Sequence, residues 1–380
     1  MLIIPILCSD IHADAEKNQV WVREKCVRSA EDVASDAFTV FIVPGDIGSE
    51  VDRIESVLRN LVANYDAVCF LPGRVQCIHT YYLYRPDNRM ATDSVAKLVE
   101  VVDRARACGV HVGPLRVQLA TAADNALSPA VLVMPLQGWY HSSWDTDPDI
   151  TDADFLAVEA AVPFCRKWGD YAMCAWPEQL ILQRDFVSNP ASNTVLAEVF
   201  AKLNEPFLHP PPERNTPEFE AASEHPEKFF GSPLAQPSDT VISFSHYLPR
   251  LELCPEKRFL TEPMLAKVIG SDVLESQVRR LQPHLHLYGH THIPLGTVLE
   301  GIRYLQWPLG YFREAHLQCA PIFSSGPLAV HDSALGSGSA GTQHLAAWSK
   351  HYRKEARDPS KVNELAPWVR ARLAAYAGMG

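Results

Sequence analysis

The sequence has no long hydrophobic run, no paired cysteines and no excess of positive charge, and each absence excludes a class of protein. A membrane-spanning helix needs about 18 or more apolar residues in succession, and no stretch reaches that length. None of the 9 cysteines forms a C-x-x-C pair, which argues against a zinc knuckle or a disulfide framework and favours a reducing compartment. The net charge of -11 argues against broad attraction to nucleic acid or membrane. We therefore expect a cytoplasmic, globular protein.

What the sequence does contain is an alternation of short apolar runs with segments of helical spacing. The first run passes directly into Asp10 and has no basic leader, which favours a buried strand over a secretion signal. Such alternation predicts an α/β protein with a largely parallel sheet. Strands are predicted at residues 2–8, 38–43, 67–71, 110–112, 131–136, 240–244, 285–288 and 302–306, and helices at 15–34, 50–65, 93–108, 152–167, 193–203 and 263–281.

The domain organisation follows from changes in composition along the chain. Residues 1–325 are predicted to form one domain, interrupted by an insertion at about 139–238 that covers or walls the cleft. The insertion opens with the aromatic run Trp139 to Asp145. These aromatic side chains either line a substrate pocket or pack in the core, and the sequence leaves both roles open. Residues 326–380 are predicted to be a Gly/Ser-rich linker followed by a basic C-terminal tail.

Carboxylate and imidazole side chains follow directly after several predicted strands. In parallel sheets, ligands bind beyond the carboxyl ends of the strands, so these side chains are expected to meet there. Mixed carboxylate and imidazole ligands suit Mn, Fe, Zn or Ni better than Ca, which prefers oxygen ligands alone. The candidate metal ligands are Asp10, His12, Asp46, His246, His290 and His292.

These residues lie in blocks that resemble the calcineurin-like metallophosphoesterase family. The family's D-x-H block is Asp10-Ile11-His12, its second block begins at Gly45-Asp46, its lone histidine is His246, and its G-H-x-H block is Gly289-His290-Thr291-His292. The resemblance covers about residues 1–325. It implies the metallo-dependent phosphatase fold, an αββα sandwich of two facing sheets flanked by helices.

The same resemblance implies two divalent or trivalent metal ions and a phosphate-ester substrate. One ion would be bound by Asp10, His12, Asp46 and His292. The other would share Asp46 and add His246 and His290. A hydroxide that bridges the ions would attack phosphorus, and manganese is one of the metals that suit such a site. Arg250, soon after His246, is a candidate phosphate contact.

The third block departs from the family pattern of Gly-Asn-His. Here Gly73 is followed by Arg74, a permanent cation that cannot bind a metal, and the histidine expected to protonate the leaving group is absent. Three interpretations are open. In the first, His79, our candidate catalytic residue, or Gln76 takes the place of the missing residues from a shifted loop. In the second, the second metal binds weakly or is lost. In the third, residues 74–79 reflect an error in the gene annotation, such as a misplaced splice junction. The second block also lacks its second acid, with Ser49 at that position.

Three functions remain in competition at this point. The leading one is a metal-dependent phosphoric ester hydrolase that acts on a phosphoprotein, a nucleotide or a small metabolite. The alternative is a catalytically impaired scaffold of the same fold that binds a protein partner. A weaker third is a mononuclear metal hydrolase acting on another ester. The acidic composition favours a phosphatase over a nuclease.

Overall fold

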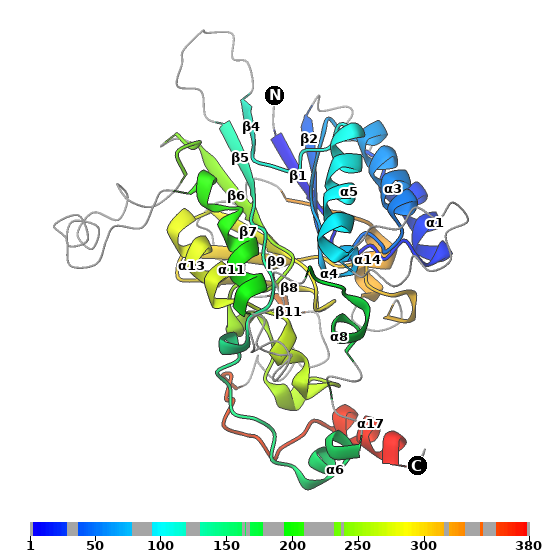
Figure 1. The fold of residues 1–380 in the computed structure, drawn as a ribbon, viewed down its shortest axis with the longest axis vertical. Coiled ribbons are helices and arrows are strands. Elements are labelled where there is room, and N and C mark those ends of the chain that lie inside the picture. The colour runs from blue at the N-terminus through cyan, green and yellow to red at the C-terminus, as the bar shows by residue number, and fades with distance from the viewer. Residues whose placement is uncertain are drawn as a thin grey trace, which may run out of the picture.

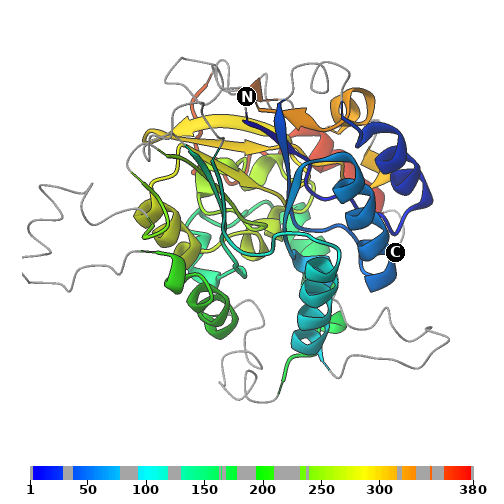
Figure 2. The same cartoon turned by 90° about the horizontal axis from the view of Figure 1, so that it is seen from above.

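Two β-sheets lie face to face at the centre of the protein, and helices cover both outer faces (Figures 1 and 2). The structure is a computed structural model. It describes residues 3–28, 37–77, 93–118, 130–161, 164, 168–177, 194–208, 232–236, 239–314, 319–330, 343–344 and 355–377.

The smaller sheet has the strand order β10-β1-β2-β3, in which β1, β2 and β3 are parallel and β10 is antiparallel. Successive side chains of a strand face opposite sides, so Ile4 and Ile6 pack towards the helices while Ile3 and Leu7 pack towards the other sheet. The strands are β10 (Leu328–Ala329), β1 (Ile3–Leu7), β2 (Phe38–Pro44) and β3 (Ala67–Leu71). The helices on this side are α1 (Glu16–Lys25), α3 (Val51–Asn64) and α5 (Ser94–Ala107) (Figure 2).

The larger sheet has the order β11-β8-β9-β7-β6-β5-β4, and its four inner strands β9, β7, β6 and β5 are parallel. Its outer face is covered by α11 (Thr194–Lys202) and α13 (Asp272–Leu281) (Figure 1). Its strands are β11 (Gln343–His344), β8 (Leu295–Leu299), β9 (Ile302–Gln306), β7 (Leu285–Tyr288), β6 (Thr240–Phe244), β5 (Ala130–Pro135) and β4 (Leu115–Gln118).

Short helices and turns connect these elements. The remaining α-helices are α4 (Arg74–Cys77), α6 (Ala153–Ala161), α8 (Asp170–Met173), α14 (Ala320–Ser325) and α17 (Pro367–Ala377). The 3₁₀ helices are η2 (Ser142–Trp144), η3 (Glu205–Phe207), η5 (Leu251–Leu253), η6 (Lys257–Phe259), η7 (Pro263–Val268) and η8 (Phe312–Glu314).

The structure corrects several expectations from periodicity. The strands divide between two facing sheets flanked by helices, as the resemblance implied, and do not form the one largely parallel sheet that the periodicity indicated. The stretch 110–112 is not a strand, and only an isolated bridge joins Cys69 to His111. The single helix expected at 263–281 is two helices, η7 and α13, because Ser271 accepts a hydrogen bond from Leu274 N (3.3 Å) and starts a new helix there. Strands β4 and β8 were not predicted.

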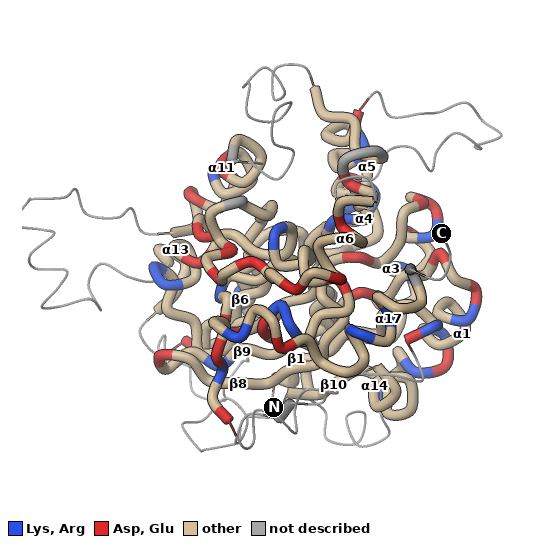
Figure 3. The backbone as a smooth tube through the Cα atoms, turned by 90° about the horizontal axis from the view of Figure 1, so that it is seen from below, with Lys and Arg blue, Asp and Glu red and all other residues tan. Residues whose placement is uncertain are grey.

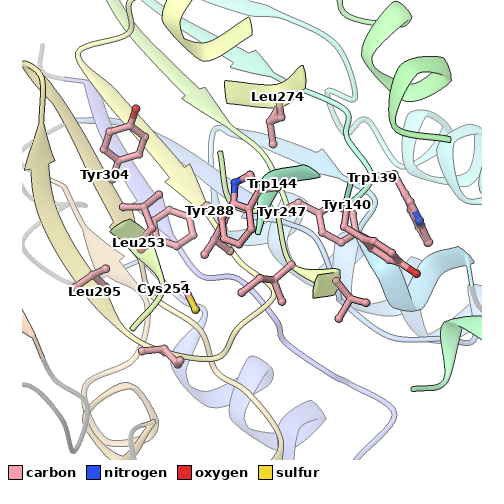
Figure 4. Close-up of a cluster of buried hydrophobic side chains, with 14 of the residues drawn as sticks. Trp139, Tyr140, Trp144, Tyr247, Leu253, Cys254, Leu274, Tyr288, Leu295 and Tyr304 are labelled. Carbon is pink, nitrogen blue, oxygen red and sulfur yellow. The ribbon is translucent and has the colours of Figure 1, made fainter. Parts of the chain in front are cut away.

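The aromatic run at the start of the insertion packs in the core. Trp139, Tyr140 and Trp144 are buried with Tyr247 and Tyr288 on the outer side of the larger sheet (Figure 4). Of the two roles left open by the sequence, packing is therefore the one observed for these three side chains.

The C-terminal helix α17 lies beside α6, a helix of the insertion (Figure 1). Val369 and Leu373 of α17 join the same core cluster as the insertion aromatics. Lysines, arginines and acidic residues are interspersed over the described elements (Figure 3). Among the helices that the structure describes, none combines the length and the apolar character of a membrane span.

Candidate metal centre

Six buried side chains form two adjacent clusters where strands of both sheets end. Asp10, His12 and His292 form the first triad, and Asp46, His246 and His290 form the second. Their exposed fractions range from 0% for Asp10 to 7% for His290 and His292. The first triad combines residues that follow β1 and β7, and the second combines residues that follow β2, β6 and β7. Both triads therefore form because the two sheets face each other.

The first triad is built around two imidazoles whose nitrogens face each other. His12 Nε2 lies 2.9 Å from His292 Nε2, and His292 Nε2 lies 3.6 Å from Asp10 Oδ1. Asp10 is held from the other side, because Ser9 Oγ donates to its Oδ2 (2.6 Å) and the backbone N–H of His290 donates to its Oδ1 (2.9 Å).

The second triad repeats this arrangement. His246 Nε2 lies 3.1 Å from His290 Nδ1 and 3.5 Å from Asp46 Oδ1. Asp46 Oδ1 also accepts a hydrogen bond from Val75 N (2.8 Å). The two triads are joined through the backbone, since His12 N donates to Asp46 O (2.9 Å).

These distances fit a ligand shell around a metal ion. Two imidazole nitrogens that each lie about 2.0–2.1 Å from one ion are roughly 2.9–3.4 Å apart at the usual coordination angles. The two observed nitrogen pairs, at 2.9 and 3.1 Å, match that spacing. Each pair has a carboxylate oxygen beside it, and carboxylate with imidazole suits the borderline transition metals. The residues present therefore fit one ion in each triad.

Backbone strain is concentrated at the same residues. Asp10, His12, Asp46, His290 and His292 all have positive φ, between 44° and 76°. A non-glycine residue in this region is uncommon and costs about 1–3 kcal/mol unless the surroundings enforce it. Five strained residues in one buried cluster indicate that the fold stabilises these conformations to aim the side chains, which is typical of functional sites.

Two glycines allow the loops to approach the second triad closely. Gly45 has φ +84°, and a Cβ there would lie 2.5 Å from His246 Nδ1. A Cβ at Gly73 would lie 2.5 Å from Asp46 Oδ1. Only glycine fits at either position, because both of these neighbours belong to the triad and cannot move without disturbing it.

The environment keeps two of the imidazoles neutral. Burial, followed by the charges of His292 and Arg74, holds the pKa of His12 well below its ordinary value. Burial, followed by the charges of His246 and Arg74, does the same to the pKa of His290. A neutral imidazole is the form that binds metal. Burial also raises the pKa of Asp10, with nearby histidines opposing the shift.

Each of three histidines is oriented by an acceptor on its far side. His246 Nδ1 lies 3.0 Å from Pro44 O, and His290 Nε2 lies 3.1 Å from Val268 O. His292 Nδ1 lies 2.8 Å from Glu314 Oε2. Burial lowers the pKa of His292, but this hydrogen bond and nearby carboxylates outweigh it, so the pKa lies above its ordinary value. Such outer acceptors fix the tautomer that points the other nitrogen at a metal.

Replacement of Glu314 by glutamine is expected to weaken metal binding in the first triad about 10–100-fold, because His292 would lose the carboxylate that orients it. The measurement is titration of the protein with manganese, monitored by isothermal titration calorimetry. Glu50→Gln, on the exposed ion pair with Arg53, is the control and should leave the affinity unchanged. An affinity in Glu314→Gln within twofold of the original would show that Glu314 does not orient a metal ligand.

The third block places Arg74 and Gln76 beside the second triad. Gln76 Oε1 accepts from Asp46 N (3.1 Å) and Gly73 N (2.7 Å), and its Nε2 donates to Gly48 O (2.8 Å). Its side chain thus joins the loop after β2 to the loop after β3. Arg74 Nη1 donates to Asp170 Oδ1 at 2.8 Å. His79, the candidate catalytic residue, lies outside the described residues.

Arg250, the candidate phosphate contact, is paired with carboxylates. Its Nη2 lies 2.7 Å from Glu252, its Nη1 lies 3.0 Å from Glu300, and its Nε lies 3.4 Å from Glu275. These three acids neutralise its charge. A contact between Arg250 and substrate therefore stays a prediction.

Sequence reasoning missed several residues around the triads. Glu314 follows no predicted strand, and the Tyr311 ring lies 4.2 Å from the His12 ring without any motif to mark it. Trp168 and Asp170 come from the insertion, and the Trp168 ring lies 6.2 Å from that of His290. None of these positions carries a local pattern, because each reaches the site only through tertiary packing.

No known protein-family profile and no curated protein match the sequence. Among solved structures, the chain is similar to phosphopantetheinyl hydrolase (PptH) from Mycobacterium tuberculosis, with a TM-score of 0.55 and 16% identity over 83% of this chain and 92% of that chain. A second solved structure aligns at a TM-score of only 0.35. The resemblance of the motifs to the calcineurin-like family stays a prediction. The similarity shows that this chain shares the fold of a known hydrolase.

Proposed function

We propose that the protein is a metal-dependent phosphoesterase with a dinuclear site formed by the two triads. The observation that carries this proposal is the pairing of imidazole nitrogens at 2.9 and 3.1 Å, each pair with a carboxylate beside it. Ligands at this spacing suit Mn, Fe, Zn or Ni. Asp46 is proposed as the ligand shared by both ions, as the resemblance of the motifs implies.

Two bound ions would supply the chemistry of such a reaction, namely activation of water at neutral pH and neutralisation of charge on the phosphoryl oxygens. The chain's own residues prepare the site. Ser9 and the backbone N–H of His290 hold Asp10, while Val75 N holds Asp46, so neither carboxylate is free to rotate. Tyr247 is buried and packs its ring 4.8 Å from that of His290.

The substrate class is proposed as a soluble phosphate ester. The structural neighbour is named a phosphopantetheinyl hydrolase, so phosphopantetheinyl compounds form one group to test beside phosphoproteins, nucleotides and small metabolites.

The test is metal content by elemental analysis on protein purified without chelator, combined with hydrolysis of p-nitrophenyl phosphate and of its bis-ester in added manganese. We expect close to two ions per chain and turnover that chelator abolishes. One ion or none, without turnover, would overturn the proposal and favour the scaffold that binds a protein partner. One tightly bound ion with hydrolysis of carboxylic esters only would favour the mononuclear hydrolase.

A further inference from the structure

The position that departs most from the family pattern lies beside the second triad. Arg74 is flanked by Gly73, where a Cβ would lie 2.5 Å from Asp46 Oδ1, and by Val75, whose N–H donates to the same oxygen at 2.8 Å. The backbone of Arg74 is therefore fixed against Asp46 on both sides. A permanent cation at the first residue of α4 is placed at the site rather than on the distant surface.

The guanidinium of Arg74 is held near the second triad by way of Trp168. It lies 5.0 Å from the centre of the Trp168 ring, and the centre of that ring lies 6.2 Å from the centre of the His290 ring. The guanidinium is therefore placed on the side of the second triad, next to the region where the reacting part of a substrate would be bound.

The insertion holds the guanidinium in place. Arg74 Nη1 donates to Asp170 Oδ1 at 2.8 Å, and the Arg74 guanidinium lies 5.0 Å from the centre of the Trp168 ring. Trp168 Nε1 in turn donates to Asp170 Oδ2 at 2.7 Å, so the three side chains fix one another. Within the described part of the chain, Arg74 Nε is buried and has no hydrogen-bond acceptor. A buried donor left without an acceptor costs about 1–3 kcal/mol, so a bound anion would relieve it.

We propose that Arg74, held by Asp170 and Trp168, is the residue that binds an anionic phosphoryl oxygen of the substrate. The inference rests on the proposed function and assigns a role to the residue that replaces the family's metal-binding asparagine. The planar guanidinium is suited to phosphate because it offers several donors in a fixed fork and carries its charge at every physiological pH. Asp170 and Trp168 are positioning residues in this arrangement, since they act through Arg74.

The first test measures binding of inorganic phosphate by calorimetry, with metal content determined on the same samples. Arg74→Gln is expected to weaken phosphate binding about 10–100-fold, the usual effect of losing a charge-assisted hydrogen bond, without lowering metal content. Arg74→Lys, which keeps the charge but not the fork, should recover part of the affinity. The matched control is Arg116→Gln, which breaks an Arg–Asp pair with Asp239 at the opposite end of β6 and should not change phosphate binding.

A second experiment uses the unaltered protein and so does not depend on the folding of a variant. Phosphate should protect Arg74 from modification by phenylglyoxal, as read by peptide mass spectrometry, and should not protect Arg116. Phosphate affinity within twofold of the original in Arg74→Gln, or equal modification with and without phosphate, would overturn the inference.

The outcomes also separate this inference from the proposed function. Phosphate binding that depends on Arg74 in a protein without phosphatase turnover supports the inference and defeats the function. Turnover with phosphate affinity indifferent to Arg74 supports the function and defeats the inference. A double variant exchanges the two partners, Arg74→Asp with Asp170→Arg. Relative to the single variants it should restore thermal stability but not phosphate affinity. If the ion pair were purely structural, phosphate affinity would be unchanged in every variant.

Discussion

Replacement of Asp46 by asparagine is expected to lower kcat/KM for p-nitrophenyl phosphate by about a thousandfold, which corresponds to the several kcal/mol that a metal ion contributes to the transition state. The substitution keeps the shape of the side chain and its acceptor for Val75 N, but it removes the charge. Because Asp46 is the proposed shared ligand, metal content should fall below one ion per chain. The measurements are steady-state kinetics in manganese and elemental analysis.

The matched control for this substitution is Asp66→Asn. Asp66 precedes β3 at the end of the sheet away from the triads, and its carboxylate also accepts from a backbone amide, Thr39 N at 2.8 Å. The Asp66→Asn variant should keep full activity and full metal content. If Asp46→Asn kept more than a tenth of the activity while Asp66→Asn behaved as expected, the dinuclear mechanism would be excluded.

Acid is expected to destabilise the protein through His286, a fully buried histidine outside the triads. Burial lowers its pKa from 6.5 to about 3. Its ring nitrogens lie 2.7 Å from Ser243 Oγ and 2.9 Å from Ser245 Oγ, and the centre of the Tyr304 ring lies 5.6 Å from the centre of the His286 ring. These three contacting groups are uncharged. Nothing in these contacts compensates the charge that protonation would bring into the core.

The direction of the pH dependence follows from the two pKa values. Between pH 6.5 and pH 3 the unfolded chain binds a proton at His286 that the folded protein does not, so the free energy of unfolding falls as the pH falls. The stabilisation is complete above about pH 6.5 and is lost at about 1.4 kcal/mol per pH unit below it. At pH 4.5 the loss from this one residue is about 2–3 kcal/mol.

The measurement is urea unfolding with chelator present at pH 7.5 and pH 4.5. His286→Gln should lose about 2–3 kcal/mol less than the unaltered protein between these two conditions, because glutamine does not titrate. His284→Gln, which replaces an exposed histidine nearby, is the control and should follow the unaltered protein. Equal pH dependence in all three proteins would show that His286 is protonated in the folded state without cost.

Much of both sheets and of the site could be predicted from local patterns. Strands β1, β2, β3, β6 and β7 coincide with apolar runs, and a polar residue directly after such a run marks the end of a strand. Asp93, expected to start a helix, caps α5 by accepting a hydrogen bond from Ala96 N at 2.9 Å. These features depend on neighbours within a few residues, which is why sequence alone indicates them.

Other features could not be predicted because they depend on distant partners. Glu314 reaches His292 across 22 residues, and Arg74 reaches Asp170 across 96. Strand β8 is only partly buried and lacks a clear apolar alternation, so pairing with β9 rather than its own pattern makes it a strand. The positive φ of five of the six candidate metal ligands is likewise enforced by the surrounding loops and not by residue type.

The sequence by itself determined which side chains end the strands, and thereby the six candidate metal ligands. The resemblance of the motifs also implied how these ligands are grouped, but only the tertiary structure brings the members of each group together, because each triad takes residues from both sheets and the sheets meet through the apolar layer between them. The role that we propose for Arg74 also depends on the tertiary structure. The local sequence does not indicate that role, which rests on the contacts of Arg74 with Asp170 and Trp168 of the insertion beside the second triad.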